Sequence, residues 1–224
     1  MKIDATRRRF ILGGGFGVAG VVLAGPAQAK DDDEVAPTED LMREHGVLRR
    51  LLLVYGEVVR RIDARQAIKP EWVSSSATII REFIEDYHEK DEEEHVFPRL
   101  QKAGKLTALV DVLYAQHQAG RRVTLDVLRL ATPAALAVET SRRQLAERLR
   151  AFVRMYEPHA AREDTVLFPA FRALLSGREL KKLMDLFEDK EKALPHGGFE
   201  KMVDEVAKIE QSIGIADLAA FTPA

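Results

Sequence analysis

The sequence of 224 residues contains no cysteine. This absence excludes a disulfide framework, thiol catalysis, a zinc ribbon and a cysteine-ligated iron–sulfur cluster. Any metal ion that the chain binds must therefore be held by histidine and carboxylate side chains, and the sequence has only 6 histidines.

A large excess of charge of either sign is also missing. The 34 basic and 36 acidic residues leave a formal net charge of -2, and no basic block occurs beyond the extreme N-terminus. Nucleic acid is therefore a poor candidate partner. The length suits one domain with a real core, and a composition rich in Leu, Ala, Glu, Arg and Lys predicts an all-α fold.

A long apolar run occurs near the N-terminus, where residues 1–29 predict a signal peptide. A short basic region precedes an apolar run at residues 10–24, and Ala27-Gln28-Ala29 matches a small-x-small cleavage site. The arginines at residues 7–9, followed by Phe10, resemble a twin-arginine signal, which implies a periplasmic or otherwise exported bacterial protein. An ordinary secretory signal and an uncleaved anchor are the alternatives. Residues 30–37 then form an acidic leader.

From Thr38 onward, apolar and histidine residues recur at alternating steps of four and three, which predicts four amphipathic helices. Short connections between them favour an up-down four-helix bundle over residues 38–174. The second helix begins near Pro70 and should end before Phe97-Pro98. In the C-terminal extension, residues 175–224, a Ser176-x-x-Glu179 capping box opens a fifth helix, and a sixth covers residues 199–212.

The four helices contain an internal repeat. His45 and His117 are 72 residues apart, and His88 and His159 are 71 apart. The motif His88-x-x-x-Glu92 in the first half corresponds to His159-x-x-x-Glu163 in the second, and each is followed by Phe-Pro. The bundle is therefore expected to consist of two similar helical hairpins.

A histidine and a glutamate four residues apart lie on one helical face, one turn from each other. A single histidine on such a seam is usually a hydrogen-bonded core residue. Four histidines and two glutamates buried together would cost several kcal/mol for each unpaired charge, whereas two divalent metals would use all of them as ligands. The repeat therefore indicates a dinuclear metal site.

These motifs resemble those of the hemerythrin-like, or HHE cation-binding, four-helix bundles over about residues 40–174. The resemblance implies a site for two non-haem iron ions. The implied terminal ligands are His45, His88, His117 and His159, and the implied bridging carboxylates are Glu92 and Glu163. Glu89 is a possible extra ligand, although its counterpart in the repeat is Ala160.

The sequence gives less evidence on the roles of the other polar residues. His95 is expected to line the mouth of the site and His196 to lie in a loop, while Tyr87 and Tyr156 are either hydrogen-bond donors near the metals or simple core residues. Arg121 occupies the place of a fifth histidine in oxygen-carrying hemerythrins. A ferritin-like site would use Glu85-x-x-His88 and Glu92-x-x-His95, but the second half of the repeat lacks a matching motif.

A di-iron site of this kind predicts binding or sensing of a small diatomic ligand, O2 or NO, rather than turnover. The alternatives are a di-iron oxidoreductase that reduces peroxide or NO, an iron-delivery or iron-centre repair protein, and an exported structural bundle with a vestigial site. Whether the protein is an enzyme stays open, and the sequence does not identify a redox partner. No membrane span is expected after removal of the signal.

Overall fold

The computed structural model describes residues 36–195 and 197–223, so the expected signal peptide and His196 lie outside the described residues. Within these ranges the chain forms helices and no strands, which confirms the all-α fold class. The first helix, α1, covers Pro37–Asp63. It begins with proline, whose missing amide hydrogen is not needed in the first turn of a helix.

Residues 70–102 form one continuous series of α- and π-helical segments, called here the 70–102 rod, which extends beyond the expected end of the second helix. It consists of α2 (Pro70–Ile79), a π-helical segment (Ile80–His88), α3 (Glu89–Asp91), a second π-helical segment (Glu92–Val96) and α4 (Phe97–Lys102). The expectation that the helix ends before Phe97-Pro98 was wrong. Pro98 lies in the first turn of α4, directly after a π-helical segment, where no amide donor is required.

The second half repeats this construction. Helix α5 covers Thr107–Leu130, a short α6 covers Pro133–Leu136, and α7 covers Glu139–Arg162. Helix α7 continues through Pro158 into a π-helical segment (Glu163–Leu167) and then α8 (Phe168–Arg172). Both rods that carry a His-x-x-x-Glu motif thus contain a π-helical segment that begins at the glutamate of the motif.

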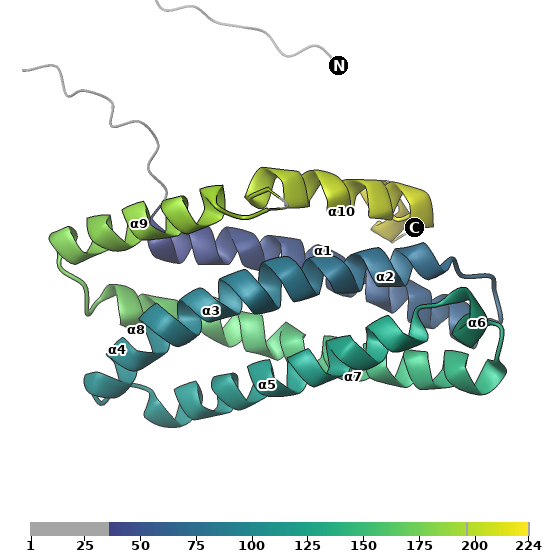
Figure 1. Cartoon of the computed structure of the whole chain (residues 1–224), viewed down its shortest axis with the longest axis horizontal. Coiled ribbons are helices and arrows are strands. Elements are labelled where there is room, and N and C mark those ends of the chain that lie inside the picture. Colours follow the sequence, from purple (N-terminus) through teal and green to yellow (C-terminus); the bar gives the residue numbers. More distant parts are fainter. Residues whose placement is uncertain (1–35, 196, 224) are drawn as a thin grey trace, which may run out of the picture. The chain divides into compact units, whose positions relative to one another are not determined.

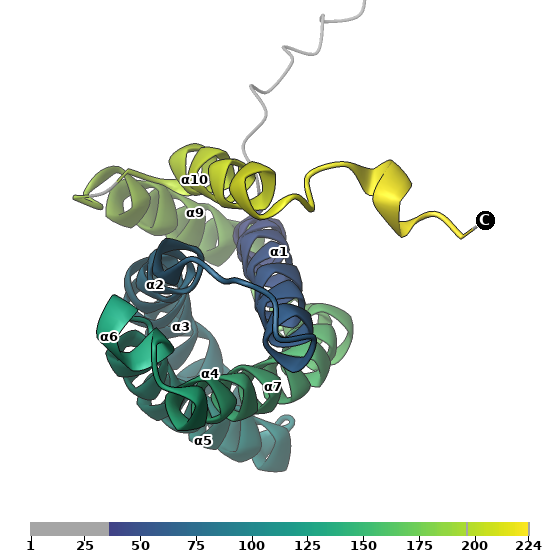
Figure 2. The ribbon, with the colours of Figure 1, turned by 90° about the vertical axis from the view of Figure 1, so that its right-hand side faces the viewer.

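The C-terminal extension forms α9 (Gly177–Lys192) and α10 (Phe199–Ile213), followed by a 3-10 turn (Leu218–Phe221). Ser176 and Glu179 make both hydrogen bonds of the predicted capping box. Gly214 ends α10 with a φ of 85°, a left-handed conformation that glycine adopts without a steric penalty. Helix α10 packs against α1 and α2, as Figures 1 and 2 show, so the extension covers one flank of the helical bundle.

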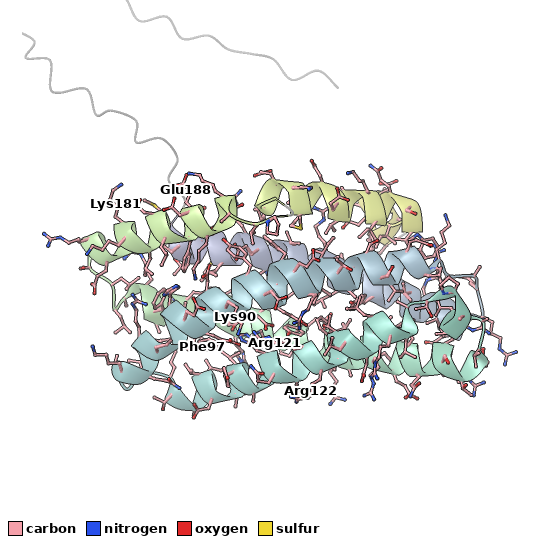
Figure 3. All side chains as sticks on the ribbon, viewed as in Figure 1. Lys90, Phe97, Arg121, Arg122, Lys181 and Glu188 are labelled. Atoms are coloured by element: carbon pink, nitrogen blue, oxygen red, sulfur yellow. The ribbon has the colours of Figure 1, made fainter. Side chains whose placement is uncertain are left out.

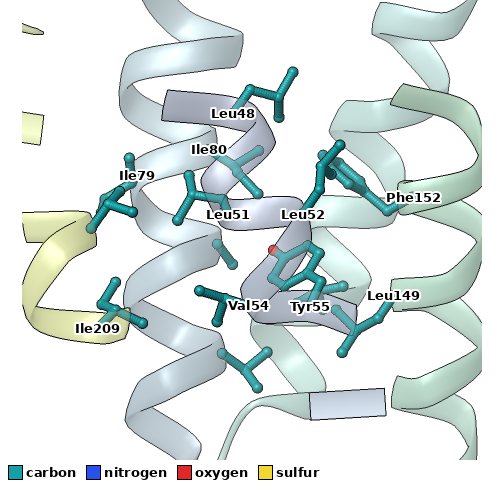
Figure 4. Close-up of a cluster of buried hydrophobic side chains, with 14 of the residues drawn as sticks. Leu48, Leu51, Leu52, Val54, Tyr55, Ile79, Ile80, Leu149, Phe152 and Ile209 are labelled. Atoms are coloured by element: carbon teal, nitrogen blue, oxygen red, sulfur yellow. The ribbon is translucent and has the colours of Figure 1, made fainter. Parts of the chain in front are cut away.

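The rods surround a common interior, which Figure 2 shows end-on. Helix α1 contacts α2 and α7, and α5 contacts the same two helices. The interior contains two separate groups of buried apolar side chains. One includes Leu51, Ile80 and Phe152, shown in Figure 4, and the other includes Phe97 and Phe168.

Polar residues separate these two apolar clusters. Along α1, His45 lies between Leu41 of the second cluster and Leu48 of the first. The candidate site therefore lies inside the bundle with apolar packing on both sides of it along the helix axes. Among the helices of the described part of the chain, none combines the length and the apolar composition needed to cross a bilayer.

Candidate metal centre

The structure brings all six sequence-predicted ligands together in the interior of the bundle. Potential ligand atoms of His45, His88 and Glu92 lie within 4.8 Å of one another, and the same holds for His117, His159 and Glu163. None of the six side chains belongs to a residue more than 3% exposed. Residues from α1, α5 and both π-containing rods therefore meet at one buried point.

The four histidines form two pairs, and in each pair the Nε2 atoms face each other. The Nε2 atoms of His45 and His88 are 3.1 Å apart, and those of His117 and His159 are 3.2 Å apart. We call these the His45–His88 position and the His117–His159 position. In each pair, one histidine comes from α1 or α5 and the other is the first residue of a His-x-x-x-Glu motif.

Each glutamate reaches histidines of both pairs. Glu163 Oε2 lies 3.3 Å from His45 Nε2 and 3.0 Å from His159 Nε2. Glu92 Oε2 lies 3.3 Å from His117 Nε2, and its Oε1 lies 3.7 Å from His88 Nε2. This arrangement suits two carboxylates that bridge two cations.

The outer nitrogen of every histidine in the site meets an oxygen acceptor. The Nδ1 atoms of His45 and His88 each lie 2.6 Å from a carboxylate oxygen, of Asp164 and Glu44 respectively. The corresponding acceptors are Glu93 for His117, at 3.2 Å, and Gln116 for His159, at 2.9 Å. Acceptors at these places favour the tautomer in which Nδ1 carries the proton and Nε2 turns its lone pair inward, as in metal-binding histidines.

The carboxylate oxygens that face inward lack hydrogen-bond partners. All four carboxylate oxygens of Glu92 and Glu163 are buried without a hydrogen bond. Such groups are expensive to bury, and paired Nε2 lone pairs about 3 Å apart would repel each other. Divalent cations between them would remove both penalties, so the residues present fit a metal. Imidazole and carboxylate donors suit iron among the first-row metals.

The surroundings shift the proton affinities of these ligands. Burial lowers the pKa of His88 well below its ordinary value, with neighbouring His45 adding to the effect, and burial also lowers the pKa of His117. Burial and the charge of Glu163 raise the pKa of Glu92. Burial likewise opposes ionisation of Glu163, but His159 and His45 outweigh it and hold the pKa of Glu163 low. Neutral imidazoles are the form that binds metal.

Aromatic rings cover the site on its second-cluster side. Phe97 stacks on His117 with a centroid distance of 5.4 Å, and Phe168 stacks on His45 at 5.6 Å. These are the two phenylalanines of the repeated Phe-Pro motif. The structure therefore assigns them a place against the ligand rings, which the motif alone did not indicate.

Sequence reasoning missed the outer acceptors, although the repeat contains a signal for them. Glu44 and Gln116 directly precede His45 and His117, while Glu93 and Asp164 directly follow the two glutamate ligands. Arginines extend the relationship, since Arg49 pairs with Asp164 and Arg121 pairs with Glu93 at 2.8 Å. The internal two-fold repeat therefore includes the residues that contact the candidate ligands as well as the candidate ligands themselves.

Glu89 lies beside the site and faces a different set of partners. Its Oε1 accepts a 2.6 Å hydrogen bond from the Tyr156 hydroxyl, and its Oε2 lies 2.8 Å from Arg121 Nη2. Burial raises the pKa of Glu89 to about 8. Figure 3 shows Arg121 on the side of α5 that faces the 70–102 rod. The cation of Arg121 points inward and is balanced by two carboxylates, those of Glu89 and Glu93.

The remaining polar residues lie away from the six ligands. His95 Nε2 lies 3.1 Å from Lys190 Nζ of α9, which also pairs with Asp91 at 2.5 Å. Glu85, required by a ferritin-like site, pairs instead with Thr124 at 2.5 Å and with Arg81 at 3.2 Å.

Comparisons with known proteins agree with this geometry. Three proteins, one from Mycobacterium bovis and two from strains of Mycobacterium tuberculosis, are described as uncharacterized and are each 50% identical to this chain over 190 residues. These matches cover 84% of this chain and 74% of each relative. No solved structure shows a significant match. The family model for the hemerythrin HHE cation binding domain matches residues 36–171, and the chain therefore belongs to this family.

Proposed function

We propose that this chain is an exported non-haem di-iron protein that binds or senses a small diatomic ligand, O2 or NO. The observation that carries the proposal is the buried set of four histidines and two glutamates whose ligand atoms face one another, with all four glutamate oxygens lacking a hydrogen bond. The family binds metal ions, typically iron. Four imidazoles and two bridging carboxylates would make one dinuclear set.

The proposed architecture is an up-down four-helix bundle over residues 38–174, with residues 175–224 as a helical extension. Each hairpin supplies two histidines and one glutamate. His45 and His88 would hold one iron and His117 and His159 the other, with Glu92 and Glu163 shared between them. This division follows the two histidine pairs.

A pair of ferrous ions bound there would supply electrons to a diatomic molecule. The protein side chains hold, orient and shield the site. Their outer acceptors keep the imidazoles in one tautomer, and Phe97, Phe168 and the two apolar clusters exclude bulk water. These features favour binding of a small uncharged ligand.

Export is the second part of the proposal and rests on residues 1–29. The pattern resembles a twin-arginine signal, and that route carries proteins already folded, often with a cofactor in place. A metal site assembled from distant segments of the chain suits such a route, because the ions are enclosed before transport. The proposed location is the periplasm or the cell exterior.

Metal analysis of iron-reconstituted protein tests the site directly. We expect about two irons per chain, since the six ligands form one dinuclear set. His88→Ala and His159→Ala should each lower the iron content. His95→Ala is the matched control, because His95 pairs with Lys190 outside the site, and this variant should keep the full content. One ion or none in the parent protein would contradict the assignment.

Ligand chemistry distinguishes the alternatives. Reduced protein should change its absorption spectrum on addition of O2 or NO without sustained consumption of either. Continued consumption of NO or peroxide in the presence of a reductant would instead support an oxidoreductase. Transfer of iron to an apo-protein acceptor would support an iron-delivery or repair role.

A further inference from the structure

The outer acceptors of the four histidines follow the internal two-fold with one chemical exception. His45 and His117, on α1 and α5, both bind a carboxylate through Nδ1, from Asp164 and Glu93. His88 and His159, the histidines of the two motifs, differ. His88 meets the carboxylate of Glu44 at 2.6 Å, whereas His159 meets the amide oxygen of Gln116 at 2.9 Å.

The two acceptors also differ in their surroundings. Glu44 is only 2% exposed, while Gln116 is half-buried. Burial, followed by the carboxylates of Asp40 and Asp91, raises the pKa of Glu44 well above its ordinary value. The difference between the two acceptors therefore rests on their geometry and chemistry, a carboxyl group at 2.6 Å from His88 and an amide at 2.9 Å from His159.

A carboxylate that accepts the Nδ1 proton of a histidine increases the basicity of the opposite nitrogen, Nε2, and strengthens its bond to a cation. A neutral amide has this effect to a smaller degree. At the His45–His88 position both histidines have carboxylate acceptors. At the His117–His159 position only His117 has one.

Glu89 is a further carboxylate close to one of the histidine rings. Its Oε2 lies 4.0 Å from His117 Nδ1, beyond hydrogen-bond distance. The Tyr156 hydroxyl and Arg121 bind its two oxygens, at 2.6 Å and 2.8 Å. Since Tyr156 and Arg121 engage both oxygens of Glu89, this side chain does not replace the missing acceptor at His159.

We infer that the two metal positions are inequivalent and that the first metal ion binds at the His45–His88 position. The reason is that the Nδ1 atom of His88 faces a carboxylate, from Glu44. The Nδ1 atom of His159 faces an amide oxygen, from Gln116, instead. This inference rests on the proposed dinuclear site. Glu44 acts as a positioning residue, since it reaches a metal only through the imidazole of His88.

Titration of metal-free protein with Zn²⁺, followed by calorimetry, tests the inference without redox chemistry. The parent should bind two ions in two resolved steps. Nitrogen-15 NMR of the histidine side chains should show His45 and His88 changing with the first equivalent and His117 and His159 with the second.

Exchange of the acceptors provides the matched variants. Glu44→Gln should weaken the first step by about 10- to 100-fold, the usual effect of losing such an acceptor, and bring the two steps together. Gln116→Glu should strengthen the second step by a comparable factor. Glu39→Gln, an exposed position on the same helix, should leave both steps unchanged. Circular dichroism of each metal-free variant checks that it folds, and Gln116→Glu decides the matter if Glu44→Gln does not.

The outcomes separate this inference from the proposed function. One contrary result is that the parent protein binds two Zn²⁺ ions with equal affinity, and another is that neither Glu44→Gln nor Gln116→Glu changes the two affinities. Either result would mean that Glu44 and Gln116 affect their histidines equally. It would overturn this inference and leave the proposed dinuclear site standing. First changes at His117 and His159 would overturn it as well. Failure of the parent to bind any Zn²⁺ would overturn the dinuclear site itself.

Discussion

Replacement of Gly120 by alanine should destabilise the protein strongly, although alanine is the better helix former. Gly120 lies within α5, against the side chain of Tyr156 on α7. A Cβ atom at this position would lie 2.0 Å from the Tyr156 hydroxyl oxygen and 2.8 Å from Cζ of the same ring. Atoms at these distances overlap, so the tyrosine would have to move.

The magnitude follows from three contributions. Overpacking a buried site costs about 1–3 kcal/mol. Movement of the ring breaks the 2.6 Å hydrogen bond from Tyr156 to Glu89. Because burial raises the pKa of Glu89 to about 8, this bond is counted as one to a neutral group, worth about 0.5–1.5 kcal/mol. The helix propensity of alanine returns about 1 kcal/mol. The free energy of unfolding should therefore fall by about 0.5–3.5 kcal/mol.

Urea unfolding of the metal-free protein, followed by far-UV circular dichroism, measures this change. Gly56→Ala in α1 is the matched control, because no atom lies within 4 Å of its added Cβ, and it should stabilise by about 0.5–1 kcal/mol. In a Tyr156→Phe background, Gly120→Ala should lower the free energy of unfolding by less, because the hydroxyl oxygen closest to the added Cβ is absent. Stabilisation by Gly120→Ala equal to that of Gly56→Ala would refute the packing of Tyr156 against Gly120.

Three further predictions concern export, pH and oxygen. Changing Arg7, Arg8 and Arg9 together to lysine should retain a precursor in the cytoplasm, because the signal requires guanidinium groups rather than charge alone; undiminished export of folded protein would favour the ordinary secretory route. Burial and nearby Glu191 raise the pKa of Asp40 to about 6, so the folded chain binds more protons than the unfolded chain between about pH 4 and pH 6, and stability falls as pH rises through that window. Urea titrations should show the stability of Asp40→Asn relative to the parent increasing from pH 4 to pH 6 and then levelling off, and a constant difference would contradict this. Reduced, iron-loaded protein mixed with air should oxidise within minutes, and Arg121→His should lengthen the life of any oxygen adduct; a spectral band that bleaches reversibly under vacuum in the parent would contradict it.

Much of the fold and all six ligand candidates could be predicted from the sequence, because the signals are local. Alternating apolar spacing identifies amphipathic helices, and the Ser176-x-x-Glu179 box identifies a helix start that the structure reproduces. The spacing in His88-x-x-x-Glu92 alone places both side chains on one face. Comparison of the two halves then showed that the motif is repeated, which made a chance arrangement improbable.

The predicted helix end was wrong because the turn before a proline determines whether the helix needs a backbone hydrogen-bond donor there. Phe97-Pro98 reads as a helix end, yet a π-helical segment just before it lets the rod continue to residue 102. The i to i+5 bonding that allows this has no simple sequence pattern.

Only the tertiary structure decided which side chains support the ligands. Glu44 meets His88 across 44 residues of sequence, and Asp164 meets His45 across 119. The sequence shows Glu89 next to a ligand, but packing against Tyr156 and Arg121 determines where its carboxylate points. A one-turn spacing is set by the geometry of a single helix. A contact between two helices depends on how their side chains fit together, as the space above Gly120 filled by Tyr156 illustrates.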